Sequence, residues 1–293
     1  MPNPSRPRVR AAAALAAGAC LILALSGCSP SSVTAGTGPA SNTGSPMRDA
    51  HVHGMSVSGQ TGQVLLATHD GLFDMTKQPA AKVGATNDLM GFTGGTDHGV
   101  LYASGHPGEG SDLPNPLGLI RSTDAGKTWE QLSRQGESDF HALTATKSGI
   151  VGFDGTLRTS PDGKSWKTVA ADFVPSALAG SPTGDTVLAT TPQGIRRSTD
   201  GGQTWKTVNS GPVVQFAAFA SAAEAVGVEP DGTVHYSPDA GSTWTRKGQI
   251  QDTVQAVAAV KGSESHLSIW AATAGGLVVS TDGGATFRPN DAS

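Results

Sequence analysis

The chain has 293 residues, among them 39 glycines, 18 prolines and only two cysteines, and its formal net charge at pH 7 is −4. This acidic balance argues against nucleic acid as a partner, because phosphates require a basic protein face. The two cysteines are Cys20 and Cys28, so the chain beyond them can form neither a disulfide nor a thiolate metal site.

Residues 1–27 have the pattern of a signal peptide. Three arginines precede an apolar stretch over 11–25, which is short for a membrane span. The sequence Leu25-Ser26-Gly27-Cys28 resembles a bacterial lipobox, which predicts cleavage before Cys28 and acylation of its thiol. We therefore expect an extracytoplasmic protein, lipid-anchored to the outer side of the bacterial cell membrane. A plain secretory signal and an uncleaved anchor are the alternatives.

Two segments follow the signal. Residues 28–49 are rich in Ser, Thr, Gly and Pro, which is typical of a disordered tether. Residues 50–293 contain short apolar runs separated by turn residues and no convincing helical pattern, so they are expected to form one all-β domain. Loss of the signal removes three arginines and no acidic residue, which changes the net charge from −4 to −7.

An eight-residue pattern, Ser-x-Asp-x-Gly-x-Thr-Trp, recurs along this domain. The copies begin at Ser122, Ser160, Ser198, Ser237 and Ser280, between 38 and 43 residues apart; the second is one residue short and the last ends in Phe. A period of this length indicates one supersecondary unit repeated many times. Each copy follows a short apolar strand, so the motif is expected in a hairpin turn between antiparallel strands.

The chemistry of this turn is structural. The carboxylate can accept backbone N–H groups of its own loop, the glycine supplies a positive φ, and the aromatic ring is buried where the chain re-enters the sheet. We expect the following residues to form turns rather than to act in catalysis: Asp124, Asp162, Asp200, Asp239 and Asp282.

The motif resembles the Asp-box, or BNR, repeat of sialidases and related β-propellers. The segments 49–54, 67–73, 103–107, 112–120 and 139–143 also resemble bacterial glycosylhydrolase-like lipoproteins. The resemblance implies blades of four antiparallel strands around a channel. Aligned on the strand before each Asp-box, the units predict a six-bladed β-propeller, with Thr76-Lys77-Gln78 in place of the motif in blade one. No strand exchange is evident, so ring closure is expected from packing of blades one and six.

The first strand of each blade should line the channel, and alternate residues of a strand face opposite sides. One face is expected to pack between blades and is apolar in all six units: Val52, Leu89, Phe140, Pro175, Val214 and Val254. The other face should point into the channel: His53, Met90, His141, Ser176, Gln215 and Gln255.

Polar, metal-competent groups gather in blades one to three. The starts of first strands and the ends of second strands share one mouth of a propeller, and an extended loop over 107–117 belongs to the same mouth. The candidate ligand-binding residues are His51, His53, His69, Asp88, Met90, His106, Asp139 and His141.

These residues allow several sites. His51, His53 and His141 could hold a transition metal, copper or zinc, and a thioether such as that of Met90 would favour copper. Alternatively, the side chains form a metal-free polar pocket or hydrogen-bond one another structurally.

Three functions remain open. The leading hypothesis is a lipid-anchored binding protein whose site takes a metal ion or a small polar ligand. The second is a glycoside hydrolase or lyase that uses Asp88 or Asp139. A typical sialidase is not expected, because the arginines that would bind the sugar carboxylate fall on no predicted first or second strand. The third is a docking scaffold for proteins, as in the photosystem II assembly factors that share this repeat.

Overall fold

The computed structural model describes residues 51–262 and 266–290. The predicted signal peptide (1–27), the acylation site at Cys28 and the tether (28–49) lie outside the described residues and stay predictions. In the part of the chain that is described, no helix is long and apolar enough to span a bilayer.

The described residues form six sheets of four antiparallel strands, which confirms the predicted six-bladed propeller. Blade one comprises β1 (Val52–Val57), β2 (Val64–Thr68), β3 (Gly71–Asp74) and β4 (Ala81–Val83), and blade two comprises β5 (Asp88–Gly94), β6 (Leu101–His106), β7 (Leu119–Ser122) and β8 (Glu130–Ser133). Blade three comprises β9 (Ala142–Thr146), β10 (Gly149–Phe153), β11 (Leu157–Ser160) and β12 (Lys167–Thr168), and blade four comprises β13 (Ala177–Gly180), β14 (Val187–Thr191), β15 (Gly194–Ser198) and β16 (Lys206–Thr207). Blade five comprises β17 (Phe216–Phe219), β18 (Ala225–Val228), β19 (Thr233–Ser237) and β20 (Thr245–Gln249), and blade six comprises β21 (Val254–Lys261), β22 (Leu267–Thr273), β23 (Gly276–Ser280) and β24 (Arg288–Pro289).

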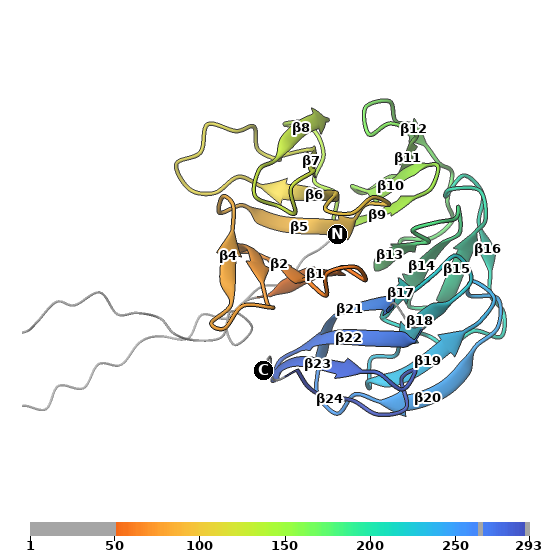
Figure 1. The fold of residues 1–293 in the computed structure, drawn as a ribbon. Helices are drawn as coiled ribbons and strands as arrows, with labels where there is room; N and C mark the ends of the chain where they lie inside the picture. Colours follow the sequence, from red (N-terminus) through yellow and green to blue (C-terminus); the bar gives the residue numbers. More distant parts are fainter. Residues whose placement is uncertain (1–50, 263–265, 291–293) are drawn as a thin grey trace, which may run out of the picture. The chain divides into compact units, whose positions relative to one another are not determined.

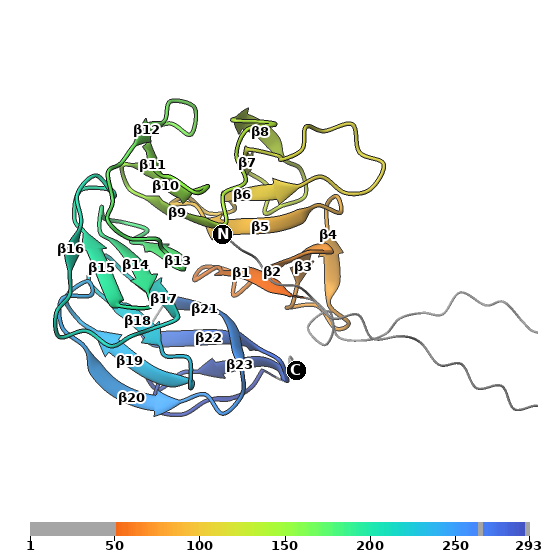
Figure 2. The same ribbon diagram turned by 180° about the vertical axis from the view of Figure 1, so that it is seen from behind.

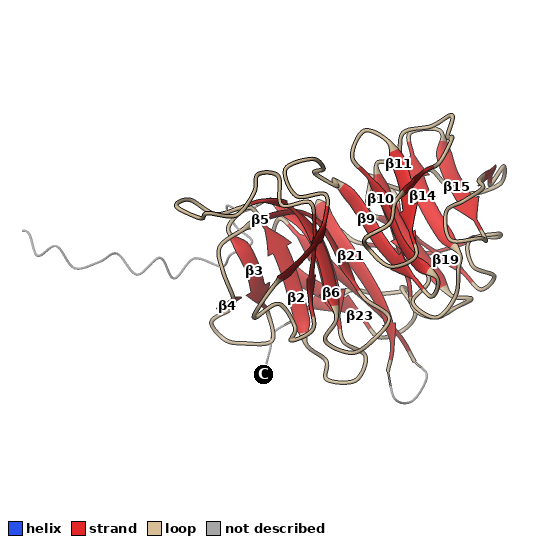
Figure 3. Cartoon of the chain, turned by 90° about the horizontal axis from the view of Figure 1, so that it is seen from above, coloured by secondary structure: helices blue, strands red, loops and turns tan. Residues whose placement is uncertain are grey.

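Strand order within every blade follows the chain, so each blade is a simple meander. The first strand of each blade lies nearest the centre of the ring and the fourth lies at the rim (Figures 1 and 2). Seen from above, the strands of neighbouring sheets run side by side and the turns gather at the ends of the strands (Figure 3).

The Asp-box turns have the expected chemistry. In blade two, Thr128 donates its backbone N–H and its hydroxyl to the Asp124 carboxylate, at 2.9 and 2.7 Å, and the Ser122 hydroxyl donates to it at 2.8 Å. The Gly126 amide in turn donates to Ser122 Oγ at 2.8 Å. The backbone hydrogen bond from Thr128 is the main cause that lowers the pKa of Asp124 to about 2. The carboxylate therefore closes the turn that joins β7 to β8.

Blade one lacks the motif but keeps a carboxylate at the same place. Asp74, at the end of β3, is buried and accepts hydrogen bonds from the backbone N–H of Thr76 at 3.0 Å and from Gln63 Nε2 at 2.9 Å. A single carboxylate can thus fix this hairpin without the remainder of the repeat.

Packing between blades confirms the predicted apolar face of the first strands. All six residues of that face are buried: Val52, Leu89, Phe140, Pro175, Val214 and Val254. Ring closure follows the same rule, because one apolar cluster joins Val52 and Leu66 of blade one to Ala256 and Leu277 of blade six. The ring therefore closes by packing of blades one and six, as expected.

Substitution of one Asp-box carboxylate should weaken the fold. Asp200 accepts hydrogen bonds from the backbone N–H and the hydroxyl of Thr204 and from the Ser198 hydroxyl. We expect Asp200→Ala to lower the free energy of unfolding by about 1–2 kcal/mol in urea denaturation at pH 7, because these donors lose a charged acceptor. The exposed residue Asp172 is the control, and Asp172→Ala should change it by less than about 0.5 kcal/mol.

The same experiment has a pH dependence of known sign. Hydrogen bonding outweighs burial and lowers the pKa of Asp200 in the folded protein, so its stabilisation is present above the unfolded pKa of about 4 and is lost as the pH falls below it. The difference between wild type and Asp200→Ala should therefore shrink in acid. An equal difference at pH 7 and pH 2 would contradict this account.

Candidate metal centre

The first strands of all six blades line a central cavity of about 1020 Å³. The structure places the whole predicted channel-facing row on its wall: His53, Met90, His141, Ser176, Gln215 and Gln255. His51 and Thr253 line the same cavity. Imidazoles and amides thus face a common space, whereas the other side of the same strands is apolar.

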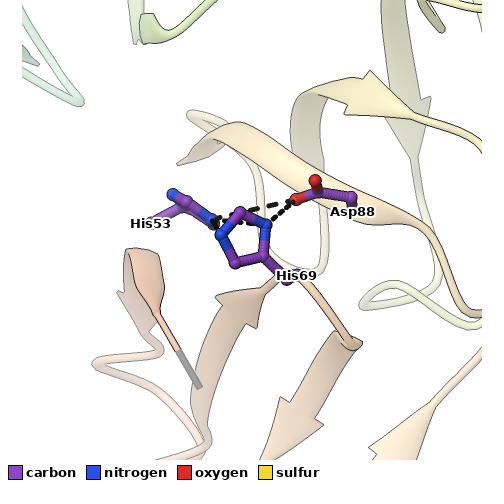
Figure 4. Close-up of side chains that lie close together, drawn as sticks. All are labelled: His53, His69 and Asp88. Carbon is purple, nitrogen blue, oxygen red and sulfur yellow. Dashed lines mark hydrogen bonds and ion pairs between the residues drawn. The ribbon is translucent and has the colours of Figure 1, made fainter. Parts of the chain in front are cut away.

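At one end of blades one and two, three side chains converge (Figure 4). His53 Nε2 lies 3.3 Å from both ring nitrogens of His69, His69 Nδ1 lies 2.9 Å from Asp88 Oδ1, and His53 Nε2 lies 3.8 Å from the same oxygen. One donor atom from each residue lies within 4.8 Å of the other two. Among the described residues, this is the one group of three or more His, Asp or Glu side chains that meets this spacing.

A β-bulge places His53 in the group. Val52 pairs with Thr68 and Gly54 pairs with Ala67, so His53 is an extra residue in β1 without a partner in β2. A bulge of this kind redirects a side chain and is common beside functional sites. A similar bulge occurs at Gln255 in β21.

The other two members are positioned by the strands around them. The Thr68 hydroxyl accepts the Asp70 N–H at 3.0 Å and donates to the Gly71 carbonyl at 3.0 Å, which fixes the turn that carries His69. Asp88 begins β5 beside Gly105 of β6, where a Cβ atom would lie 2.0 Å from the Asp88 carbonyl oxygen. A larger residue at Gly105 would therefore displace Asp88.

The geometry of the three donors fits ligands that share one ion. Four ligands at 2.0–2.1 Å in a tetrahedron lie about 3.3 Å apart, and the three distances here are 2.9, 3.3 and 3.8 Å. Asp88 Oδ1 is buried and accepts no hydrogen bond from any described residue, although His69 Nδ1 is close. A buried oxygen without a donor is costly unless a cation satisfies it.

The surroundings of His53 disfavour its charged form. Burial lowers its pKa below the ordinary value of 6.5, and the nearby His69 ring lowers it further, whereas Asp88 raises it. Its side chain is 15% exposed, against 45% for His69 and 25% for Asp88. A neutral imidazole is the form that binds a metal.

A second group lies at the junction of blades two and three. His141 Nε2 lies 2.6 Å from Asp139 Oδ2, and His106 Nε2 lies 3.2 Å from the same oxygen. His106 Nδ1 donates to Asn115 Oδ1 at 2.7 Å. Asn115 belongs to the long loop between β6 and β7, drawn in yellow in Figure 1.

The structure therefore divides the predicted site residues between two groups. The close group joins His53 to His69 and Asp88, whereas the sequence pointed to His51, His53 and His141 as the metal ligands. The ring centroid of His51 lies 5.7 Å from that of His69, and His141 pairs with Asp139 instead. Met90 lines the cavity.

Sequence reasoning missed two features. Asn115 was part of a loop recognised only by its length, and nothing in its local pattern indicated that its carbonyl would meet His106. The bulge at His53 has no signal in the sequence either, because it is defined by pairing with another strand.

Comparisons with known proteins agree with the fold. The BNR/Asp-box repeat family profile matches residues 196–207. The chain has no detectable similarity to a curated protein sequence. Among solved structures, it is similar to the GH74 xyloglucanase from Xanthomonas campestris, with 14% identity, a TM-score of 0.60, and coverage of 84% of this chain and 39% of that one.

Two further solved structures are similar to this chain in fold. A GH74 enzyme from Niastella koreensis has 18% identity, a TM-score of 0.58, and coverage of 84% of this chain and 38% of that one. The WD40 repeats of RRP9 have 11% identity, a TM-score of 0.50, and coverage of 80% of this chain and 81% of that one. The chain spans about two fifths of the length of both GH74 proteins. At these identities the likeness shows the fold alone.

The environment of His53 can be tested by titration. In metal-free protein, NMR of the imidazole signals should show a pKa for His53 below 6.5, because burial and His69 both disfavour the imidazolium. His69→Ala should raise this pKa, and Asp88→Asn should lower it further. A His53 pKa above 6.5, or no response to either variant, would contradict the described geometry.

Proposed function

We propose that this chain, an Asp-box (BNR) repeat β-propeller, binds a divalent transition-metal ion through His53, His69 and Asp88. One observation carries the proposal: donor atoms from two neighbouring blades lie within 4.8 Å of one another, as ligands of one ion do. These residues are distant from one another in the sequence, and the propeller fold brings them together.

The donor set favours particular ions. Two imidazoles and one carboxylate suit zinc and also copper, nickel or iron, whereas calcium and magnesium prefer oxygen ligands alone. Cysteine is absent from residues 29–293, so a site for thiolate-bound metal is excluded there.

Three protein ligands leave a coordination position for another molecule. His53 lies on the wall of the central cavity, together with Gln255. Gln255 Oε1 is buried and accepts no hydrogen bond from a described residue. We therefore infer that a small polar ligand of the ion enters from the cavity, where Gln255 can accept a hydrogen bond from it.

A metal-ligand role accounts better for the two candidate carboxylates than a glycosidase role does. Asp88 and Asp139 each lie within 3.2 Å of a histidine nitrogen. A glycosidase needs one carboxyl group that is free to give a proton to the sugar. The GH74 likeness supports an enzyme only through the fold, which hosts many functions.

A role in protein docking has one observation in its favour. Three exposed large apolar side chains, Leu113, Val174 and Val213, lie on the loop after β6 and on the connections that lead to β13 and β17. All three connections are at the end of the blades that carries the metal site. A protein partner would therefore approach the face that holds the ion.

The metal can be tested directly. We expect metal-free protein to bind about one equivalent of Zn²⁺ tightly in isothermal titration calorimetry, and a hundredfold excess over Kd to add about 2.7 kcal/mol to the free energy of unfolding. His53→Gln and Asp88→Asn should each weaken zinc binding by more than about 100-fold. Replacement of a residue that only hydrogen-bonds a metal ligand already lowers metal affinity about 10–100-fold, and these two variants remove a ligand itself.

His98→Gln is the matched control. His98 lies near Ser58 at the opposite ends of the strands, with Nδ1 3.5 Å from Ser58 Oγ, and its removal should leave zinc affinity unchanged. Equal zinc affinity in wild type, His53→Gln and Asp88→Asn would refute the proposed site.

We also propose that Cys28 carries a lipid that holds the propeller on the outer side of the bacterial membrane. The support is the lipobox-like sequence after an export signal, followed by a Ser/Thr/Gly/Pro-rich tether. In cells, wild type should fractionate with membranes and incorporate a labelled fatty acid, and Cys28→Ser should do neither. Membrane retention of Cys28→Ser without label would indicate an uncleaved anchor instead.

A further inference from the structure

The two His/Asp groups have the same relation to the propeller. His69 follows the second strand of blade one and approaches Asp88 at the start of blade two, at 2.9 Å. His106 ends the second strand of blade two and approaches Asp139, just before the first strand of blade three, at 3.2 Å. The repeat therefore places a histidine and an aspartate from successive blades in contact at two successive junctions.

We propose that His106, Asp139 and His141 form a second site for a divalent transition-metal ion, at the junction of blades two and three. The inference stands on this group alone and does not require an ion at His53. It assigns Asn115 as a positioning residue that acts through His106.

The tautomer of His106 is the first argument. Asn115 Oδ1 is a carbonyl oxygen and can only accept, so His106 Nδ1 donates the proton of that 2.7 Å hydrogen bond. In the neutral ring, Nε2 then carries the lone pair, and it lies 3.2 Å from Asp139 Oδ2. Two lone pairs at this distance repel each other unless a proton or a metal ion lies between them. This orientation of a ligand by an outer hydrogen bond is general among metal-bound histidines.

Asp139 supplies the second argument. Its Oδ1 atom is buried and has no hydrogen-bond partner among the described residues, whereas Oδ2 is approached by both histidines. Burial of an unpaired carboxylate oxygen is costly, and coordination of a cation removes that cost.

The surrounding structure holds Asp139 in place. Phe140 is fully buried, its N–H donates to Ser104 Oγ of blade two at 2.9 Å, and its ring stacks on Trp166 with centroids 4.8 Å apart. On the other side, Ser138 is buried and donates to Asp154 Oδ2 at 2.6 Å. Asp139 thus stands between two anchored neighbours.

His141 supplies the third ligand of the proposed site when its ring rotates toward the ion. Its Nε2 atom lies 2.6 Å from Asp139 Oδ2 and that of His106 lies 3.2 Å from the same oxygen, and the three donors are less closely grouped than those of the first site. The His141 side chain is 62% exposed, and its ring can turn toward an ion without disturbing the core. The need for this movement, and the greater exposure, predict weaker binding than at His53, His69 and Asp88.

Stoichiometry tests the inference. Metal-free protein is titrated with Zn²⁺, and with Co²⁺ to follow its visible absorption, in wild type, His106→Gln, Asp139→Asn, His53→Gln and the double variant His53→Gln/His106→Gln. We expect two equivalents in wild type, one in each single variant and none in the double variant. Asn115→Ala keeps all three ligands and should retain two equivalents, with the weaker site weakened further by about 10–100-fold.

The outcomes separate this site from the one proposed above. One equivalent in wild type that survives His106→Gln and is lost in His53→Gln overturns the second site and leaves the first. One equivalent lost in His106→Gln but not in His53→Gln supports the second site and overturns the first. Zinc binding that is unchanged in Asn115→Ala overturns its role in positioning His106. Circular dichroism checks that each variant is folded, and His98→Gln controls for loss of a histidine outside both groups.

Discussion

Burial of one apolar residue near the start of each first strand is the constraint on which the rest of this structure depends. Phe140 shows it most clearly, since its ring fills the junction between blades two and three and stacks on Trp166. Once such a residue is buried, the alternation of the strand directs its neighbours to the central cavity. His141 faces the cavity for this reason, and so do Ser176 and Gln215 of blades four and five.

The site arises where the alternation is interrupted. His53 is an extra residue in β1, and the interruption directs its ring toward His69, with Asp88 beyond. A bulge leaves one residue without its hydrogen bonds to the neighbouring strand, which costs some stability. Bulges are nevertheless retained in proteins where they redirect a functional side chain. Gln255, which lies at the bulge in β21, is also on the cavity wall.

The blades are similar in backbone and unequal in chemistry. The Asp-box carboxylates close outer hairpins and keep a low pKa because backbone amides surround them, so they are unsuited to proton transfer near neutral pH. Four histidines, His53, His69, His106 and His141, gather with Asp88 and Asp139 at the junctions of blades one to three. A repeat that provides rigid, equivalent positions allows a few substitutions to build a site at one junction and a related one at the next.

The sequence by itself determined the architecture. An eight-residue turn motif that recurs every 38 to 43 residues and apolar alternation in the first strands are local properties, so blade type, blade number and the cavity-facing row were all predictable. Closure by blades one and six followed from the absence of strand exchange. The eight site residues were also named from the sequence, because they occupy the ends of identifiable strands.

Only the tertiary structure decided how they are grouped. His69 meets Asp88 across a blade junction, and His53 reaches them through a bulge, which depends on pairing between strands and leaves no trace in either strand alone. Asn115 shows the same limit, since contact with His106 depends on the path of a loop that no repeat specifies.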